Sequence, residues 1–183
     1  NQTSCTITVD VVSTQVGSYT NGPTNVTTTG LNAPGSTTVQ YTNPVEWTCS
    51  PDGYLFQSIG TTTAIFAVDL VTGAYAQTGT ISRPSNAQGY NTTDDYVYAV
   101  IQQRVHRVGS DGTTNDVTPA TGWVPGLYNI GDFDEAGHYW VSRNVAGSPW
   151  FEIDYAAGSP TYGQVISSGT LSPANISVGS DWV

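Results

Sequence analysis

The sequence contains no lysine, and arginine occurs at only four positions. Charged residues make up 10% of the 183 positions, and the formal net charge is −10. A chain this acidic is repelled by the phosphates of nucleic acids and by anionic lipid headgroups, so we expect neither nucleic acid nor a membrane surface as a partner. Apolar runs are only a few residues long, which predicts that no segment spans a bilayer as a helix.

Motifs for cofactor chemistry are also missing. The sequence has no nucleophile elbow, no phosphate-binding loop and no dinucleotide fingerprint. Two histidines with two cysteines that we expect to pair cannot complete a standard zinc site. The stretch "DFDEAG" (132–137) begins like a calcium loop, but the last liganding position is Arg143 instead of glutamate. The sequence therefore predicts no cofactor and no metal.

The cysteine content and the sequons favour an extracellular protein. Cys5 and Cys49 are the only cysteines, and in an oxidising compartment we expect a disulfide between them; two buried thiols are the alternative. The chain begins at an asparagine with no apolar leader, as a mature secreted chain would. Four sequons predict N-glycosylation at Asn1, Asn25, Asn91 and Asn175.

A pattern recurs every 43 residues. Asn43, Asn86 and Asn129 each stand four residues before an aromatic side chain, and a second aromatic run follows. Each unit then contains an alternating strand, a turn closed by glycine and a more polar strand. Four short antiparallel strands in about 43 residues correspond to one propeller blade. We therefore predict an all-β fold, a β-propeller of four-stranded antiparallel blades, with repeats at 43–85, 86–128 and 129–176; an accidental likeness in a β-sandwich is the alternative.

The stretch "FAVDLVTGAYAQTGTI" (66–81) resembles the turn of secreted bacterial and fungal propeller repeats. Together with "TCSPDGYLFQ" and "GYNTTDDYVYA", it makes residues 43–183 similar to uncharacterised secreted fungal proteins. This resemblance implies the propeller architecture and assigns no catalytic residue.

The two ends of the chain leave the number of blades open. Residues 1–42 contain strand-like stretches, and 177–183 look like the start of a further blade. One interpretation closes a four-bladed ring with these segments. The other makes the chain part of a larger propeller, completed by a second polypeptide that pairs with the strand before Val183.

Carboxylates precede the first aromatic residue of several units. Glu46, Asp132 and Asp181 would line one level of the inner strands if the alignment holds. Such a cluster is a candidate for acid–base catalysis or for holding a cation, and solvated acids are the alternative. Asn43, Asn86 and Asn129 are candidate ligand-binding residues, although their amides could instead bridge adjacent inner strands.

The segment "RVHRV" (104–108) is the only cationic cluster. Arg104 and His106 share one face of a strand and could recognise a sugar carboxylate, or could pair with nearby acids. Trp123 could stack on a sugar ring. We therefore expect a secreted glycoprotein that binds an extracellular ligand, with a glycan as the leading candidate. The alternatives are a carbohydrate-active enzyme using Glu46, Asp132, Asp134, Glu135 and Asp181, and a structural cell-surface protein.

Overall fold

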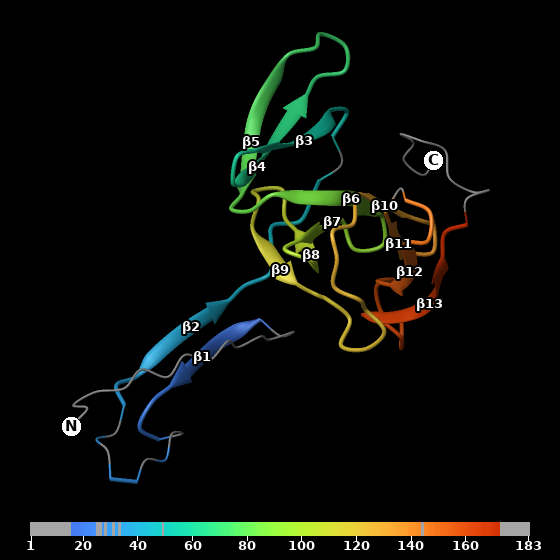
Figure 1. Cartoon of the computed structure of the whole chain (residues 1–183). Coiled ribbons are helices and arrows are strands. Elements are labelled where there is room, and N and C mark those ends of the chain that lie inside the picture. Colours follow the sequence, from blue (N-terminus) through green and yellow to red (C-terminus); the bar gives the residue numbers. More distant parts are fainter. Residues whose placement is uncertain are drawn as a thin grey trace. The chain divides into compact units, whose positions relative to one another are not determined.

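The computed structural model describes residues 16–24, 27, 29–30, 32, 34–48, 50–143 and 145–172. Within this part of the chain, thirteen strands form four antiparallel sheets and there is no helix (Figure 1). Consequently, none of these residues belongs to a helix that could cross a membrane. The chain divides into two compact units, 1–43 and 44–183.

The described residues of the first unit form one hairpin, with strands β1 (Gly17–Asn21) and β2 (Thr37–Tyr41). Its cross-strand side chains are hydrogen bonded: the hydroxyls of Thr20 and Thr38 lie 2.8 Å apart, and the Gln40 amide donates to the Ser18 hydroxyl at 3.1 Å. These pairs fix the register of the two strands.

The part of the second unit that the structure describes forms three sheets, in which each strand pairs with the next along the chain. We name them the first, second and third sheets. The first comprises β3 (Gly53–Ile59), β4 (Thr62–Val68) and β5 (Tyr75–Ile81); the second β6 (Ser85–Asn91), β7 (Tyr96–Ile101), β8 (Arg104–Val108) and β9 (Thr114–Asp116); the third β10 (Ile130–Phe133), β11 (His138–Ser142), β12 (Pro149–Asp154) and β13 (Gln164–Thr170).

The last two strands of each sheet follow the predicted repeat. The alternating strands are β4, β8 and β12, and the polar strands after them are β5, β9 and β13. The turn between them contains Gly73, Gly112 or Gly158, with φ of 73°, 85° and 78°. Glycine is favoured there because other residues seldom adopt this left-handed conformation. The repeated sequence thus encodes a repeated hairpin.

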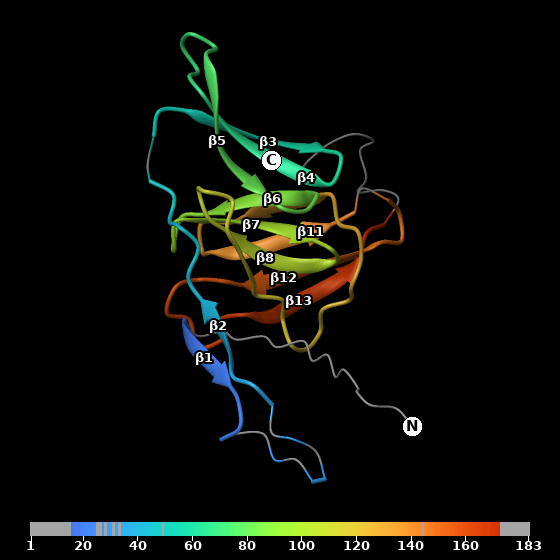
Figure 2. The ribbon, with the colours of Figure 1, turned by 90° about the vertical axis from the view of Figure 1, so that its left-hand side faces the viewer.

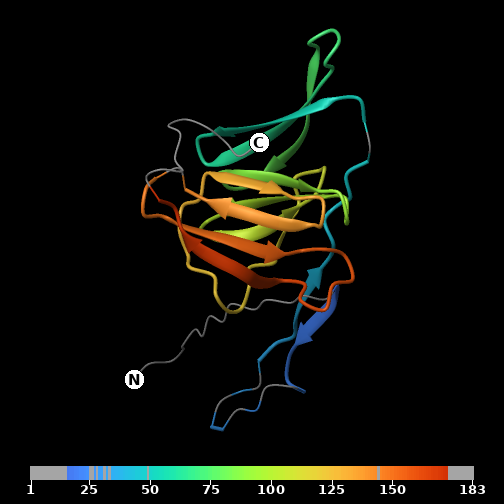
Figure 3. The same cartoon turned by 90° about the vertical axis from the view of Figure 1, so that its right-hand side faces the viewer.

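The three sheets stack face to face, with the second in the middle (Figures 2 and 3). All six residues of β7 are buried. Val97, Ala99 and Ile101 pack with Ile65 of the first sheet. Alternate residues of β7 face the opposite way and pack with the third sheet in a cluster that includes Tyr96, Tyr98, Val100, Tyr139, Val141 and Ile153. Because successive side chains point to opposite faces, one apolar strand supplies two cores.

The first strands of the second and third sheets, β6 and β10, approach closely. A Cβ at Gly131 would lie 2.5 Å from the carbonyl oxygen of Ala87, and one at Gly89 would lie 3.0 Å from Cα of Asp132. The Tyr139 hydroxyl donates to the same Ala87 carbonyl. Only glycine leaves room for this contact between backbones.

The first repeat departs from the prediction in one respect. We expected Asn43 and Trp47 on an inner strand, but the described residues of this segment form none. Pro44 provides no backbone N–H for a ladder. The segment bonds instead to the second sheet: the Trp47 amide donates to Asp95 at 2.9 Å, and its indole donates to the Val108 carbonyl at 2.9 Å.

Candidate functional site

An aromatic pocket lies between the first sheet and residues of β6, β7 and β10 in the other two sheets. Its volume is about 400 Å³, and four of its lining residues carry aromatic rings: Trp47, Tyr54, Phe56 and Tyr90. The remaining lining residues are mostly polar or small: Thr48, Ser50, Gln88, Gly89, Val97 and Asp132. A concave surface of rings with a few polar groups is typical of a small-molecule site.

Contacts with neighbouring side chains hold the aromatic rings of the pocket in place. Trp47 is buried, and Tyr54 meets it edge-on with ring centroids 4.7 Å apart. Tyr54 and Tyr90 are 40% and 38% exposed, so both present surface to a ligand. The Tyr90 hydroxyl donates to the Asp95 carboxylate at 2.7 Å, which orients its ring. Two exposed rings on a fixed support form a preorganised platform.

Of the three predicted acids, the structure describes Glu46 and Asp132, and these two do not share the pocket. Asp132 is exposed and lines the pocket. Glu46 does not line it, and its carboxylate interacts with the Tyr96 hydroxyl. Asp181 lies outside the described residues, as do the predicted Cys5–Cys49 disulfide and the last segment, 177–183. Of the two acids of the trio that the structure describes, Asp132 alone lines the pocket.

The cationic cluster is engaged in structural contacts. Arg104 forms an ion pair with Asp116, and His106 stands opposite Asp116 on the neighbouring strand. Burial lowers the pKa of His106. The Trp123 indole donates to the Gln103 carbonyl at 3.0 Å, and its ring packs on Tyr128 and Phe151. None of these three predicted ligand residues lines the pocket.

The asparagines require one correction. Asn91 is fully buried; its amide nitrogen donates to the Tyr155 carbonyl at 2.9 Å, and its oxygen accepts from Thr93. A glycan on that nitrogen is incompatible with this fold, so the predicted glycosylation of Asn91 is wrong. The sequons at Asn1, Asn25 and Asn175 lie outside the described residues.

The three repeat asparagines occupy different positions. Asn86 lies in β6, where its side-chain oxygen accepts from the Ala87 amide at 3.0 Å. Asn129 immediately precedes β10, and Asn43 precedes Pro44 in the segment without a strand. None of the three lines the pocket.

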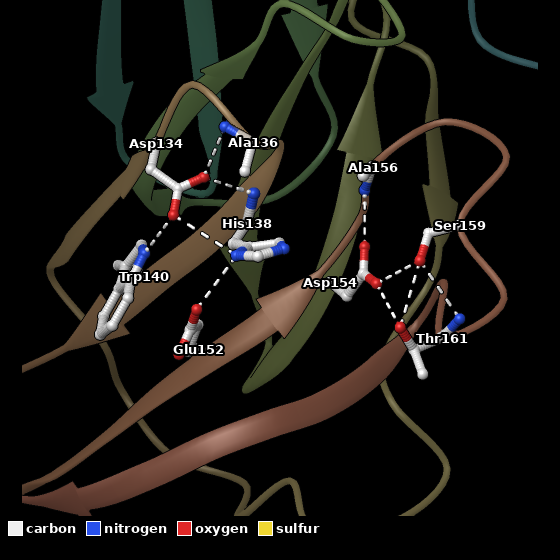
Figure 4. A network of polar contacts seen from close by, with 9 residues as sticks. All are labelled: Asp134, Ala136, His138, Trp140, Glu152, Asp154, Ala156, Ser159 and Thr161. Carbon is white, nitrogen blue, oxygen red and sulfur yellow. Dashed lines mark hydrogen bonds and ion pairs between the residues drawn. The ribbon is translucent and has the colours of Figure 1, made fainter.

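A second candidate site, formed by polar side chains, lies in the third sheet (Figure 4). Asp134 follows β10, His138 begins β11 and Glu152 lies on β12. Nδ1 of His138 lies 3.0 Å from Oε1 of Glu152 and 3.4 Å from Oδ2 of Asp134. One possible ligand atom from each residue lies within 4.8 Å of the other two, and all three side chains are half-buried. We call this group the Asp–His–Glu cluster.

Hydrogen bonds orient Asp134 within the cluster. Oδ1 accepts from the backbone amides of Ala136 and His138, each at 3.0 Å, and Oδ2 accepts from the Trp140 indole at 3.0 Å. Burial alone would raise the pKa of Asp134, but these donors and the nearby His138 hold it below its usual value. The carboxylate is thus ionised and fixed in position.

Sequence reasoning did not connect these three residues. Asp134 and His138 flank the β10–β11 turn, in which the Asp134 amide donates to the His138 carbonyl at 3.1 Å. Glu152 is fourteen positions further along and is placed by the pairing of Trp140 with Glu152 across β11 and β12. In the sequence, the only signal for this cluster was the spacing of an acid and a histidine, Asp134 and His138, across a turn. Finding Glu152 required the register of the strands.

Asp154 is the centre of a neighbouring network (Figure 4). It is buried at the end of β12 and accepts hydrogen bonds from the hydroxyls of Ser159 and Thr161 and from the Ala156 amide. Burial opposes its ionisation, but these donors together lower the pKa of Asp154. The network ties the β12–β13 loop to the sheet.

Replacing Asp154 with alanine should lower the free energy of unfolding by about 2 kcal/mol at pH 7, because three donors lose a charged acceptor. The folded-state pKa lies below the unfolded one, so this stabilisation is present above about pH 4 and is lost as the pH falls through the folded-state pKa. Urea unfolding at pH 7 and at pH 2.5 should show the difference from wild type shrinking at the lower pH.

Asp69→Ala provides the control, since Asp69 accepts amide hydrogen bonds from Val71 and Thr72 in the aligned β4–β5 turn but is less buried than Asp154. It should destabilise the protein less than Asp154→Ala. Equal effects of the two substitutions, or a pH-independent effect at Asp154, would contradict the role given to this network.

Comparison with known proteins gives a family without an assigned activity. A family model described as "Repeat of unknown function (DUF6923)" matches residues 74–182, which is more than half of the chain. No curated protein matches the sequence. The match begins just before β5 and includes the second and third sheets, so it covers the Asp–His–Glu cluster and part of the pocket. The chain therefore belongs to the family of repeats of unknown function DUF6923.

Proposed function

We propose that this protein is a secreted β-propeller-type module that binds an extracellular glycan in the aromatic pocket. The support for a propeller is the stack itself. The second sheet is buried on both faces, and β6 lies beside β10 at the inner edge, as expected for neighbouring blades. We keep both closures, a four-bladed ring and a larger ring completed by a second chain.

The pocket is the observation that carries the binding proposal. Sugar rings present apolar C–H faces, which pack on aromatic rings, and hydroxyls, which need hydrogen-bonding partners. Tyr54 and Tyr90 supply exposed rings, while Gln88 and Asp132 supply an amide and a carboxylate. A volume of about 400 Å³ is within the range of small-ligand sites.

The same pocket favours binding over hydrolysis. Glycoside hydrolases require two carboxyl groups about 5 to 10 Å apart on either side of the scissile bond. Among the described residues that line the pocket, Asp132 is the only acid. Asp134 is committed to its cluster, and Glu46 is directed to Tyr96. The carbohydrate-active enzyme is therefore our second candidate.

A glycan array probed with the untagged full-length chain tests the proposal, followed by calorimetry with the strongest glycan. Tyr90→Ala and Asp132→Asn should each weaken binding about tenfold or more, which corresponds to about 1.4 kcal/mol. Tyr75→Ala is the matched control because Tyr75 is 73% exposed and lies outside the pocket; its affinity should equal that of wild type.

Three results would contradict the proposed glycan binding. A folded protein that binds no glycan would overturn the proposal and favour a structural surface protein. Equal loss in Tyr75→Ala and Tyr90→Ala would place the site elsewhere. Release of reducing ends or of unsaturated products from the bound glycan would replace binding with the enzymatic candidate.

A further inference from the structure

The Asp–His–Glu cluster has the composition of a metal site. It combines one imidazole nitrogen with two carboxylate oxygens, contributed by a turn and two adjacent strands. Ligands about 2.1 Å from a tetrahedral ion lie roughly 3.4 Å apart. The distances of 3.0 and 3.4 Å from His138 to its two neighbours are close to that value.

The hydrogen bonds and strand positions that hold the cluster also suit a metal ion. Metal-bound carboxylates are generally held by outer hydrogen bonds, which fix their orientation. Asp134 receives three such bonds, from two backbone amides and the Trp140 indole. Glu152 is held on the middle of β12 and is the least exposed of the three side chains, at 16%. The ligand atoms are therefore positioned by backbone register instead of by flexible loops.

The charge balance favours a cation over a simple ion pair. Two carboxylates face one imidazole, so the cluster carries net negative charge whether or not His138 is protonated. We propose that Asp134, His138 and Glu152 bind one divalent transition-metal ion. The mixture of imidazole and carboxylate ligands points to Zn²⁺. Three protein ligands leave the fourth tetrahedral position open to water or to a ligand oxygen.

The test uses untagged, chelator-stripped, full-length protein and zinc chloride as the probe. Calorimetry near pH 7.5 should show saturable binding of one ion per chain, and zinc should raise the melting temperature. Because the Trp140 indole contacts Asp134, binding should also change tryptophan fluorescence. Co²⁺ should give the visible absorption of a low-symmetry, four-coordinate site.

Glu152→Gln preserves shape and removes a charge, so it should weaken zinc binding at least tenfold without unfolding the chain. His138→Gln should do the same. The chain offers a matched control in His106, its only other histidine, which lies beside Asp116. His106→Gln should bind zinc like wild type.

Two results would overturn the site. One is the absence of saturable zinc binding below 1 mM in folded wild-type protein, which would leave His138 as a side chain that only contacts the two carboxylates. The other is one-to-one binding that is undiminished in folded Glu152→Gln or that is lost in folded His106→Gln. Glycan binding is measured separately at the pocket, so failure of the zinc site would leave the proposed function unaffected.

Discussion

Replacing Ile153 with alanine should lower the free energy of unfolding by about 3 kcal/mol and the melting temperature by roughly 10 °C. Ile153 lies on β12, is fully buried and belongs to the cluster between the second and third sheets. Truncation removes apolar contacts and leaves a cavity whose walls, built from rigid strands and tyrosine rings, collapse only partly. Thermal and urea unfolding followed by circular dichroism measure the change.

The neighbouring strand provides a matched control. Ile166 on β13 is 41% exposed, so Ile166→Ala should change the free energy of unfolding by less than about 1 kcal/mol. If both variants were equally stable, the cluster would not be a true core, and the face-to-face packing of these sheets would be wrong.

Gly131→Ala should cost about 3 kcal/mol even though it adds a single methyl group. That methyl would lie 2.5 Å from the carbonyl oxygen of Ala87 and 2.7 Å from the Tyr139 hydroxyl. Relief requires β10 to move away from β6, which also breaks the hydrogen bond from Tyr139 to Ala87. Near-ultraviolet circular dichroism should report the altered tyrosine environment along with the lower stability.

Gly35→Ala is the control for this substitution. A Cβ at Gly35 meets no atom within 4 Å, and its φ does not require glycine. Its free energy of unfolding should stay within about 0.5 kcal/mol of wild type. A Gly131→Ala protein as stable as Gly35→Ala would show that β6 and β10 have space between them for a methyl group, contrary to their close approach at Gly131.

Local chemistry made much of the fold predictable. Alternation of apolar residues and the glycines at 73, 112 and 158 identify the hairpins of all three sheets, because strand faces and left-handed turns are local requirements. The missing first strand of the first sheet was not predictable from the repeat. Pro44 weakens a ladder there, but the position of Trp47 depends on partners in the second sheet, Asp95 and Val108.

The candidate sites, like the fold, could be predicted only in part from the sequence. Two of the aligned aromatic positions, Trp47 and Tyr90, do line one pocket, as does Asp132. Glu46 occupies the aligned position in the first repeat but does not line the pocket, because its segment lacks the strand that would present it. The Asp–His–Glu cluster depends on the register of β11 with β12, which no periodicity in the sequence specifies.

The two glycines at the contact between β6 and β10 also make the repeats non-interchangeable. Gly89 aligns with Glu46 and Asp132 in the other repeats, and Gly131 aligns with Val45 and Gln88, so neither glycine is a repeated position. Each fits one particular neighbour: Gly89 the backbone of Asp132, and Gly131 the carbonyl of Ala87. A copy of the second repeat in place of the third would put the Gln88 side chain where Gly131 now admits a backbone. Each repeat therefore fits its own neighbours, and steric exclusion between β6 and β10 opposes the exchange of repeats within the chain or between chains.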